Sequence, residues 1–117
     1  MVDDEAHVRK ALERLLRGAG LEVETYASGE EYLAAFERSR PDCVVLDAHM
    51  PGATGFEVQQ RMRACGSRIA VVMISGHDGA GAEGLALSNG AHAYLRKPVD
   101  GVVLVNAIEG AIQASRR

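Results

Sequence analysis

The sequence has few cysteines, no long apolar run and little net charge. Its two cysteines, Cys43 and Cys65, are too few for a disulfide framework, and their apolar surroundings favour reduced, buried thiols. The apolar runs are far too short to span a bilayer, and no signal-peptide pattern opens the sequence. A net charge of -3 argues against direct binding of nucleic acid. We therefore expect a protein of the reducing cytoplasm that contacts neither membrane nor nucleic acid.

The composition is that of an ordinary globular protein. Hydrophobic residues make up 47% of the 117 residues and charged residues 25%, which suffices for one hydrophobic core. Because no linker, repeat or low-complexity segment interrupts the sequence, we expect a single domain over residues 1–117.

Helical and strand patterns alternate along the sequence. Helical spacing and capping-box pairs such as Ser28 with Glu31 and Thr54 with Glu57 predict five helices. These helices lie near residues 8–18, 28–36, 54–65, 76–90 and 104–112. Apolar runs predict strands at 21–26, 43–47, 69–75 and 93–95, of which the first has interleaved polar residues typical of an edge. Such alternation with short connections predicts an α/β fold with a parallel sheet and helices on both faces.

Polar residues follow the apolar runs at the points where a parallel sheet binds ligands. In such a sheet, ligands bind beyond the carboxyl ends of the strands. The residues at these ends are Asp3, Asp4, Asp47, Ser75 and Lys97. Three carboxylates, one hydroxyl and one amine are therefore expected at one edge.

Five motifs in this order resemble the response regulator receiver family. They are Val2-Asp3-Asp4-Glu5, Val44-Val45-Leu46-Asp47, Met50-Pro51-Gly52 with Gly55, Ser75, and Tyr94-Leu95-Arg96-Lys97-Pro98. The resemblance covers nearly the whole sequence. It implies a flavodoxin-like, doubly wound, five-stranded parallel sheet of strand order 2-1-3-4-5, the arrangement that a known receiver also has.

The resemblance also implies a magnesium site and a phosphoacceptor. Asp3, Asp4, Asp47 and the backbone carbonyl of His49 match the family's Mg²⁺ ligands, and Mg²⁺ prefers oxygen ligands of this kind. Asp47 matches the nucleophile that accepts a phosphoryl group from a sensor histidine kinase or a phosphotransfer protein. Lys97 would supply positive charge beside it. The expected role is that of a phosphoacceptor in a two-component phosphorelay and not that of an enzyme.

A conformational switch is expected to follow phosphorylation. The Ser75 hydroxyl would bond the phosphoryl group, and the ring of Tyr94 would turn inward behind it. The face built from residues 79–112 would then change shape and bind a partner. A homodimer through this face, or through exchange of the first strand, is the expected form of self-association.

Simpler interpretations of the same residues stay open at this point. Asp47 would also suit a loop cap, Asp3 and Asp4 a solvated pair near a helix start, and Ser75 a helix cap. The four histidines are read as structural or solvent-facing; His77 is close enough to Ser75 in sequence to influence loss of the phosphate.

One departure from the family concerns the first strand. The resemblance implies roughly five strand residues before the acidic pair, a usual strand length, where this sequence has Met1 and Val2. Three or four fewer buried apolar residues correspond to about 5–12 kcal/mol of stabilisation. We therefore expect a low melting temperature, with weakened placement of Asp3 and Asp4, a rearranged sheet or strand exchange. The alternative is that the start was assigned too late in the reading frame, so that the first strand is longer than this sequence shows.

Two other functions remain as alternatives. A binding module with a degenerate receiver fold would bind its partner without phosphate. A flavodoxin-like enzyme or nucleotide-binding protein would need a glycine-rich phosphate loop after the first strand, which the sequence lacks.

Overall fold

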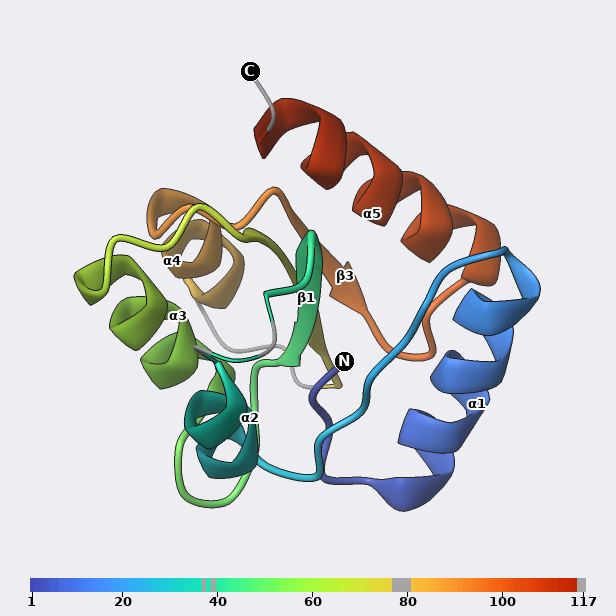
Figure 1. Cartoon of the computed structure of the whole chain (residues 1–117), viewed down its shortest axis with the longest axis horizontal. Helices are drawn as coiled ribbons and strands as arrows, with labels where there is room; N and C mark the ends of the chain where they lie inside the picture. Colours follow the sequence, from blue (N-terminus) through green and yellow to red (C-terminus); the bar gives the residue numbers. More distant parts are fainter. Residues whose placement is uncertain (37, 39, 77–80, 116–117) are drawn as a thin grey trace.

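A three-stranded parallel sheet between two helical layers forms the protein (Figure 1). The computed structural model describes residues 1–36, 38, 40–76 and 81–115. The strands are β1 (Cys43–Asp47), β2 (Ala70–Ser75) and β3 (Ala93–Arg96). The helices are α1 (Ala6–Gly18), α2 (Gly29–Ala35), α3 (Gly55–Ala64), α4 (Ala82–Ser88) and α5 (Gly101–Ser115). The predicted α/β class is therefore confirmed.

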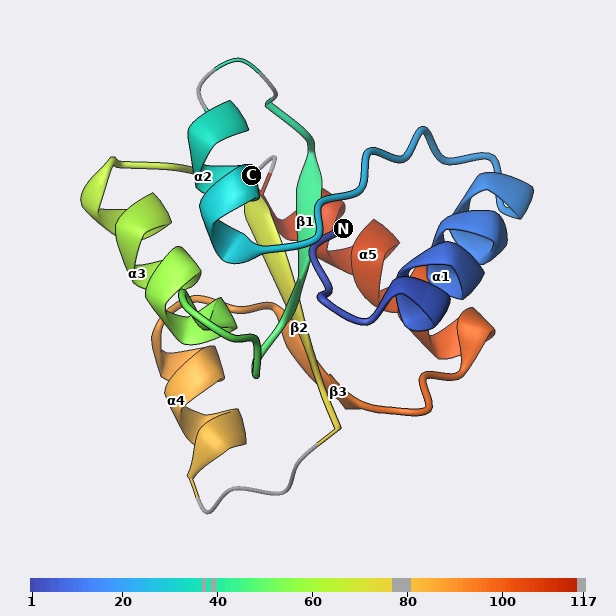
Figure 2. The same ribbon diagram turned by 90° about the horizontal axis from the view of Figure 1, so that it is seen from below.

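The strands lie in the order β1-β2-β3 and all run in the same direction. Val45 pairs with Val72, and Ile74 pairs with Leu95. Helix α3 connects β1 to β2, and α4 connects β2 to β3, so the carboxyl ends of all three strands meet at one edge. Figure 2 shows α1 and α5 on one side of the sheet and α2, α3 and α4 on the other.

Val2 extends the sheet beyond β1 by a single residue. It forms isolated parallel bridges with Tyr26 on one side and Leu46 on the other. The Val2 N–H donates to the Val45 carbonyl at 2.8 Å, and the Asp47 N–H donates to the Val2 carbonyl at 3.0 Å. In chain order this is the expected arrangement 2-1-3-4-5, with the first two strands reduced to one bridge each.

The expected edge strand over residues 21–26 is thus much shorter than the sequence predicts. Only Tyr26 is bridged, and residues 21–25 have no strand assignment. A strand requires a partner for its backbone groups, and here Met1 and Asp3 form backbone hydrogen bonds with Glu24 and Tyr26. The expected shortening of the first strand is confirmed, and it shortens its neighbour as well.

Two apolar cores fill the space between the sheet and its helical layers. Val44, Leu46 and Met73 point into the core beneath α2, α3 and α4. Val45 and Val72 point into the other core, beneath α1 and α5. Because β1 and β2 are covered on both faces, their side chains are apolar at successive positions, as the sequence indicated.

Two predicted helix starts are confirmed by the caps at their amino ends. The Ser28 hydroxyl accepts a hydrogen bond from the Glu31 N–H at 3.1 Å, and Thr54 forms a complete capping box with Glu57. Helix α4 is shorter than the expected segment 76–90 because it begins after Gly81, whose φ of +80° lies in the left-handed region. Residues 77–80 lie outside the described residues. The suggested influence of His77 on loss of the phosphate therefore stays a prediction. Within the described ranges, no helix combines the length and apolarity needed to cross a membrane.

Candidate functional site

Asp47 ends β1 and lies at the edge where the three strands terminate. Asp47 is 2% exposed, and its Oδ1 accepts a hydrogen bond from the His49 N–H at 3.3 Å. The first residue of α3, Gly55, packs directly on the backbone of Asp47, and its N–H donates to the Ala48 carbonyl at 3.1 Å. A Cβ at Gly55 would collide with the Asp47 carbonyl oxygen. The absence of a side chain at Gly55 therefore lets α3 close on the loop that follows β1.

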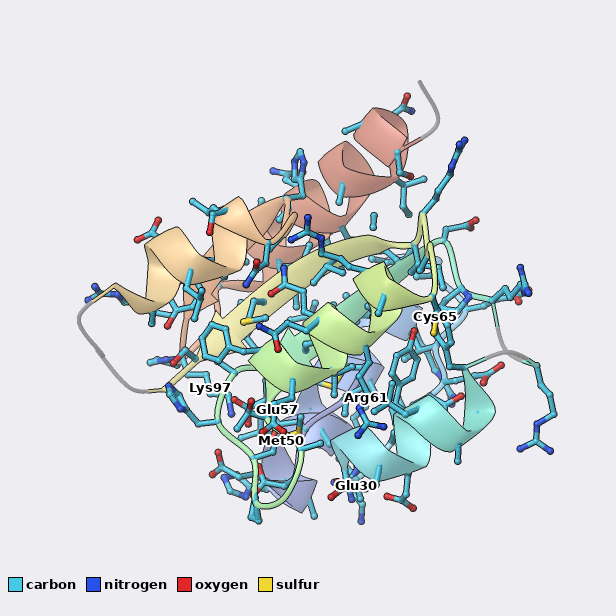
Figure 3. All side chains as sticks on the ribbon, turned by 90° about the vertical axis from the view of Figure 1, so that its left-hand side faces the viewer. Glu30, Met50, Glu57, Arg61, Cys65 and Lys97 are labelled. Carbon is cyan, nitrogen blue, oxygen red and sulfur yellow. The ribbon has the colours of Figure 1, made fainter. Side chains whose placement is uncertain are left out.

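Lys97 reaches Asp47 from the turn after β3. The Lys97 N–H donates to the Ser75 carbonyl at 2.9 Å, and a cis peptide bond joins Lys97 to Pro98. The Lys97 Nζ lies 3.2 Å from Asp47 Oδ2, and Figure 3 shows Lys97 beside the loop that carries Met50. Residues separated by 50 positions are thus brought together by the parallel arrangement of β1, β2 and β3.

Asp3 is the second buried carboxylate of the site, with 0% exposure. Its Oδ1 accepts a hydrogen bond from the Glu5 N–H at 2.9 Å, and its carbonyl accepts one from Arg9 at 2.7 Å. Its Oδ2 lies 2.9 Å from the Lys97 Nζ but has no aligned hydrogen-bond donor. We describe this contact as an ion pair, because charge attraction depends less on alignment than a hydrogen bond does.

The three predicted aspartates gather closely enough to hold a cation. One carboxylate oxygen from each of Asp3, Asp4 and Asp47 lies within 4.8 Å of the others. Asp3 and Asp47 are buried, whereas Asp4 is exposed, so the cluster opens to solvent on one side. Buried carboxylates repel one another, and the Asp3 Oδ2 lacks an aligned donor. This donor set consists only of oxygen atoms and fits a hard divalent cation.

Electrostatics at the site raise the pKa values of both Asp47 and Lys97. Burial and then the charge of Asp3 raise the pKa of Asp47 from 3.8 to about 6, although Lys97 and the His49 N–H oppose the shift. Burial disfavours the Lys97 ammonium, but its contacts with the Asp3 and Glu5 carboxylates and the charge of Asp47 raise the pKa of Lys97 overall. At neutral pH the site therefore holds a mostly ionised Asp47 beside a permanently charged ammonium.

The two residues predicted to switch lie next to this cluster. Ser75 ends β2, is 1% exposed, and shares a backbone hydrogen bond with Lys97. Tyr94 lies on β3 opposite Met73 and packs, half-buried, against the core beneath α4. The ligand role of the His49 carbonyl stays a prediction.

Glu5 belongs to the Val2-Asp3-Asp4-Glu5 motif, but the sequence indicates no role for it at the site. The Glu5 Oε1 lies 3.1 Å from the Lys97 Nζ, on the solvent side of the ammonium. A third carboxylate after an aspartate pair is a weak signal, because helix starts often carry acidic residues. Only the approach of Lys97 from the far end of the chain gives Glu5 this contact.

Comparison with known proteins assigns the family. The model of the response regulator receiver domain matches residues 1–109. The chain belongs to the response regulator receiver family. As a receiver domain it is part of two-component signalling, and its motifs lie where the sequence resemblance placed them.

Individual relatives agree with this assignment. Response regulator protein TodT of Pseudomonas putida is 34% identical over 113 residues, which are 97% of this receiver and 50% of TodT. A response regulator receiver protein from Burkholderia phymatum has a TM-score of 0.81 and 44% identity, with 96% of this chain and 91% of that chain covered. A receiver domain protein from Clostridium thermocellum has a TM-score of 0.91 and 32% identity, with 98% and 93% covered. The receiver thus spans about half the length of its relative TodT and nearly the whole of the two solved structures.

Proposed function

We propose that this receiver accepts a phosphoryl group on Asp47 and transmits the change through Ser75 and Tyr94. The observation that carries the proposal is the position of the Lys97 ammonium, 3.2 Å from Asp47 Oδ2. Carboxylate oxygens of Asp3, Asp4 and Asp47 lie within 4.8 Å of one another at the same place. Phosphoryl transfer requires charge neutralisation and positioning more than acid–base catalysis. The cluster supplies both requirements at a single carboxylate.

The transfer step is a substitution at phosphorus. A carboxylate oxygen of Asp47 attacks the phosphorus of a phosphohistidine on a sensor kinase or phosphotransfer protein. The new P–O bond forms as the P–N bond breaks, and the imidazole nitrogen keeps the electron pair and takes a proton from solvent. Lys97 stays protonated throughout and offsets the charge on the transferred group.

Mg²⁺ is the cation that we propose for the aspartate cluster. Asp3, Asp4 and Asp47 would hold it, together with the His49 carbonyl, and it would offset the negative charge of the phosphoryl oxygens. The buried Asp3 Oδ2, which lacks an aligned donor, supports this assignment.

We propose that a change at Asp47 reaches the face of α4, β3 and α5 through Ser75 and Lys97. The Ser75 hydroxyl would donate to the phosphoryl group, and the backbone bond between Ser75 and Lys97 couples the loops after β2 and β3. Tyr94 lies on β3, the strand that leads into the second of these loops. We propose that partners and a second receiver bind this face in the phosphorylated state.

The chain itself is the acceptor in this scheme, so each copy takes one phosphoryl group and does not turn over as an enzyme. We propose a cytoplasmic location, which the free thiols of Cys43 and Cys65 support.

The test is a phosphorylation assay with a small acyl phosphate and Mg²⁺. The intact protein should gain the mass of one phosphoryl group, and borohydride reduction should locate the acyl phosphate at Asp47. Asp47→Ala should give no adduct. Asp42→Asn, which changes an exposed aspartate directly before β1, should react like the wild type. An unmodified wild type, or an adduct that persists in Asp47→Ala, would overturn the proposal and favour a module that binds its partner without phosphate.

A further inference from the structure

The loop between β1 and α3, residues 48–54, carries backbone groups of the phosphorylation site. The His49 N–H donates to Asp47 Oδ1 at 3.3 Å, and the His49 carbonyl is a ligand in the proposed Mg²⁺ site. The loop closes where the Gly55 N–H donates to the Ala48 carbonyl at 3.1 Å. The position of the His49 carbonyl therefore depends on what holds the rest of this loop.

Glu30, in the first turn of α2, holds the far end of the loop. Its Oε2 accepts a hydrogen bond from the Ala53 N–H at 3.2 Å. The two residues lie 23 positions apart, so the bond joins α2 to a separate part of the chain. Figure 3 labels Glu30 on α2 and Met50 in the loop. A hydrogen bond to a carboxylate is charge-assisted, and it is stronger than a bond to a neutral acceptor.

The start of α2 and the loop approach each other closely on both sides of this bond. A Cβ at Gly52 would collide with the Glu30 carboxylate, and the φ of Gly52 is +75°, in the left-handed region. A Cβ at Gly29 would lie 2.9 Å from the Ala53 carbonyl oxygen and 2.7 Å from Cγ2 of Val58. Because neither glycine has a side chain, the Glu30 carboxylate can lie directly on the loop backbone.

The next residue of the loop is held from the other side. The Thr54 N–H donates to Glu57 Oε1 at 3.3 Å, within the capping box of α3. The successive N–H groups of Ala53 and Thr54 therefore bond to carboxylates of two different helices. The Glu57 bond is local and follows wherever α3 begins. The Glu30 bond, by contrast, fixes the loop relative to α2.

We propose that Glu30 is a positioning residue for phosphoryl transfer. Through Ala53 it holds residues 48–54 so that the His49 carbonyl stays directed toward the aspartate cluster. This inference rests on the proposed function, and Glu30 itself touches neither the phosphoryl group nor the cation. Because Glu30 acts on the place of a ligand and not on the nucleophile, its loss should weaken Mg²⁺ binding. The phosphorylation rate at saturating Mg²⁺ should change little.

Hydrogen exchange in metal-free buffer tests the contact without phosphorylation. Glu30→Ala removes the acceptor, and the Ala53 amide should then exchange about tenfold faster or more, with faster exchange at His49 as well. Glu22→Ala removes an exposed carboxylate of the segment before α2 and should leave both exchange rates unchanged. Unchanged exchange at Ala53 in Glu30→Ala would overturn the proposal, and so would equal acceleration in the two variants.

Mg²⁺ titrations test the consequence for the site. The dissociation constant measured by calorimetry should rise about three- to tenfold in Glu30→Ala, the range that loss of one hydrogen bond allows. Glu30→Gln keeps an oxygen acceptor for the Ala53 N–H and should recover most of the affinity, while Glu22→Ala should bind like the wild type. With a small acyl phosphate, the Mg²⁺ concentration for half-maximal rate should rise in parallel. A lower maximal rate at an unchanged Mg²⁺ requirement would overturn the proposal.

The two proposals fail in different ways. A wild type that binds Mg²⁺ but takes up no phosphoryl group would overturn the acceptor role of Asp47, while the exchange and calorimetric comparisons would still decide the role of Glu30. A wild type that is phosphorylated, with equal Mg²⁺ affinities for wild type and Glu30→Ala, would overturn the role of Glu30 alone.

Discussion

The ammonium of Lys97 lies 3.2 Å from Oδ2 of Asp47, and the two side chains are 13% and 3% exposed. The same ammonium lies 2.9 Å from Asp3 and 3.1 Å from Glu5. One cation is thus shared by three carboxylates in a place with little water. The members of this cluster cannot contribute equally to stability, because loss of the cation leaves several anions unpaired whereas loss of one anion leaves the cation paired.

Removal of the cation should be strongly destabilising. In Lys97→Met, Asp3 and Asp47 remain buried without their partner, and the expected loss in the free energy of unfolding is about 3–5 kcal/mol. Urea denaturation without Mg²⁺ measures it. Lys10→Met, which changes an exposed lysine of α1, should stay within about 0.5 kcal/mol of the wild type. A loss for Lys97→Met as small as that of Lys10→Met would contradict the proposed importance of the buried ion pairs.

Removal of the phosphoacceptor charge should have the opposite sign. Asp47→Asn keeps the shape of the side chain, removes a desolvated charge and leaves Lys97 paired with Asp3 and Glu5. We expect the free energy of unfolding to rise by about 1–3 kcal/mol at pH 8 without Mg²⁺. Saturating Mg²⁺ should reduce this advantage, since the cation stabilises the ionised cluster of the wild type. A less stable Asp47→Asn in metal-free buffer would show that the carboxylate is not under electrostatic strain.

The pH dependence of stability follows from the pKa of Asp47, which burial raises from 3.8 to about 6. Between these two values the folded state holds a proton that the unfolded state has already released. The Asp47 contribution to stability should therefore fall as the pH rises from about 4 to about 6, and stay constant above that range. Other carboxyl groups titrate in the same window, so the quantity to plot is the difference between wild type and Asp47→Asn in metal-free buffer. A difference that does not change with pH would contradict the raised pKa.

The parts of this receiver that sequence predicts well are those fixed by local chemistry. Thr54 and Glu57 lie three positions apart, and their reciprocal hydrogen bonds need no distant partner. Likewise, the unbroken apolar run before Asp47 requires cover on both faces wherever it lies. The family motifs then gave the order of the strands and the convergence of Asp47 with Lys97.

The parts that sequence predicts poorly depend on partners far along the chain. Residues 21–26 have a strand-like pattern, yet only Tyr26 is bridged, through Val2. Glu5 acquires its contact only because the turn after β3 delivers Lys97 to it. In both cases the local pattern is compatible with several outcomes, and tertiary pairing selects one of them.

Two glycines give a matched test of the packing behind Asp47. A Cβ at Gly55 would collide with the Asp47 carbonyl oxygen and lie 2.9 Å from the Ala48 Cα, so Gly55→Ala must displace α3 or the site loop. We expect a loss of about 1–3 kcal/mol and slower phosphorylation of Asp47. Gly84 lies within α4, where a Cβ meets nothing within 4 Å, and Gly84→Ala should stabilise by about 0.5–1 kcal/mol. Thermal denaturation separates the two, and equal effects would contradict the close approach at Gly55.

The two cysteines should differ widely in reactivity although both are free. Burial raises the pKa of Cys43 to about 12, whereas Cys65 is exposed at the end of α3. The thiolate is the reactive form, so the half-buried Cys43 should react with a maleimide about a hundredfold or more slowly than Cys65 near pH 7.5. Mass spectrometry after timed labelling measures both rates, with Cys65→Ser to isolate Cys43 and urea to show that both thiols react alike once unfolded. Comparable rates in the folded protein would mean that the amino end of β1 opens frequently.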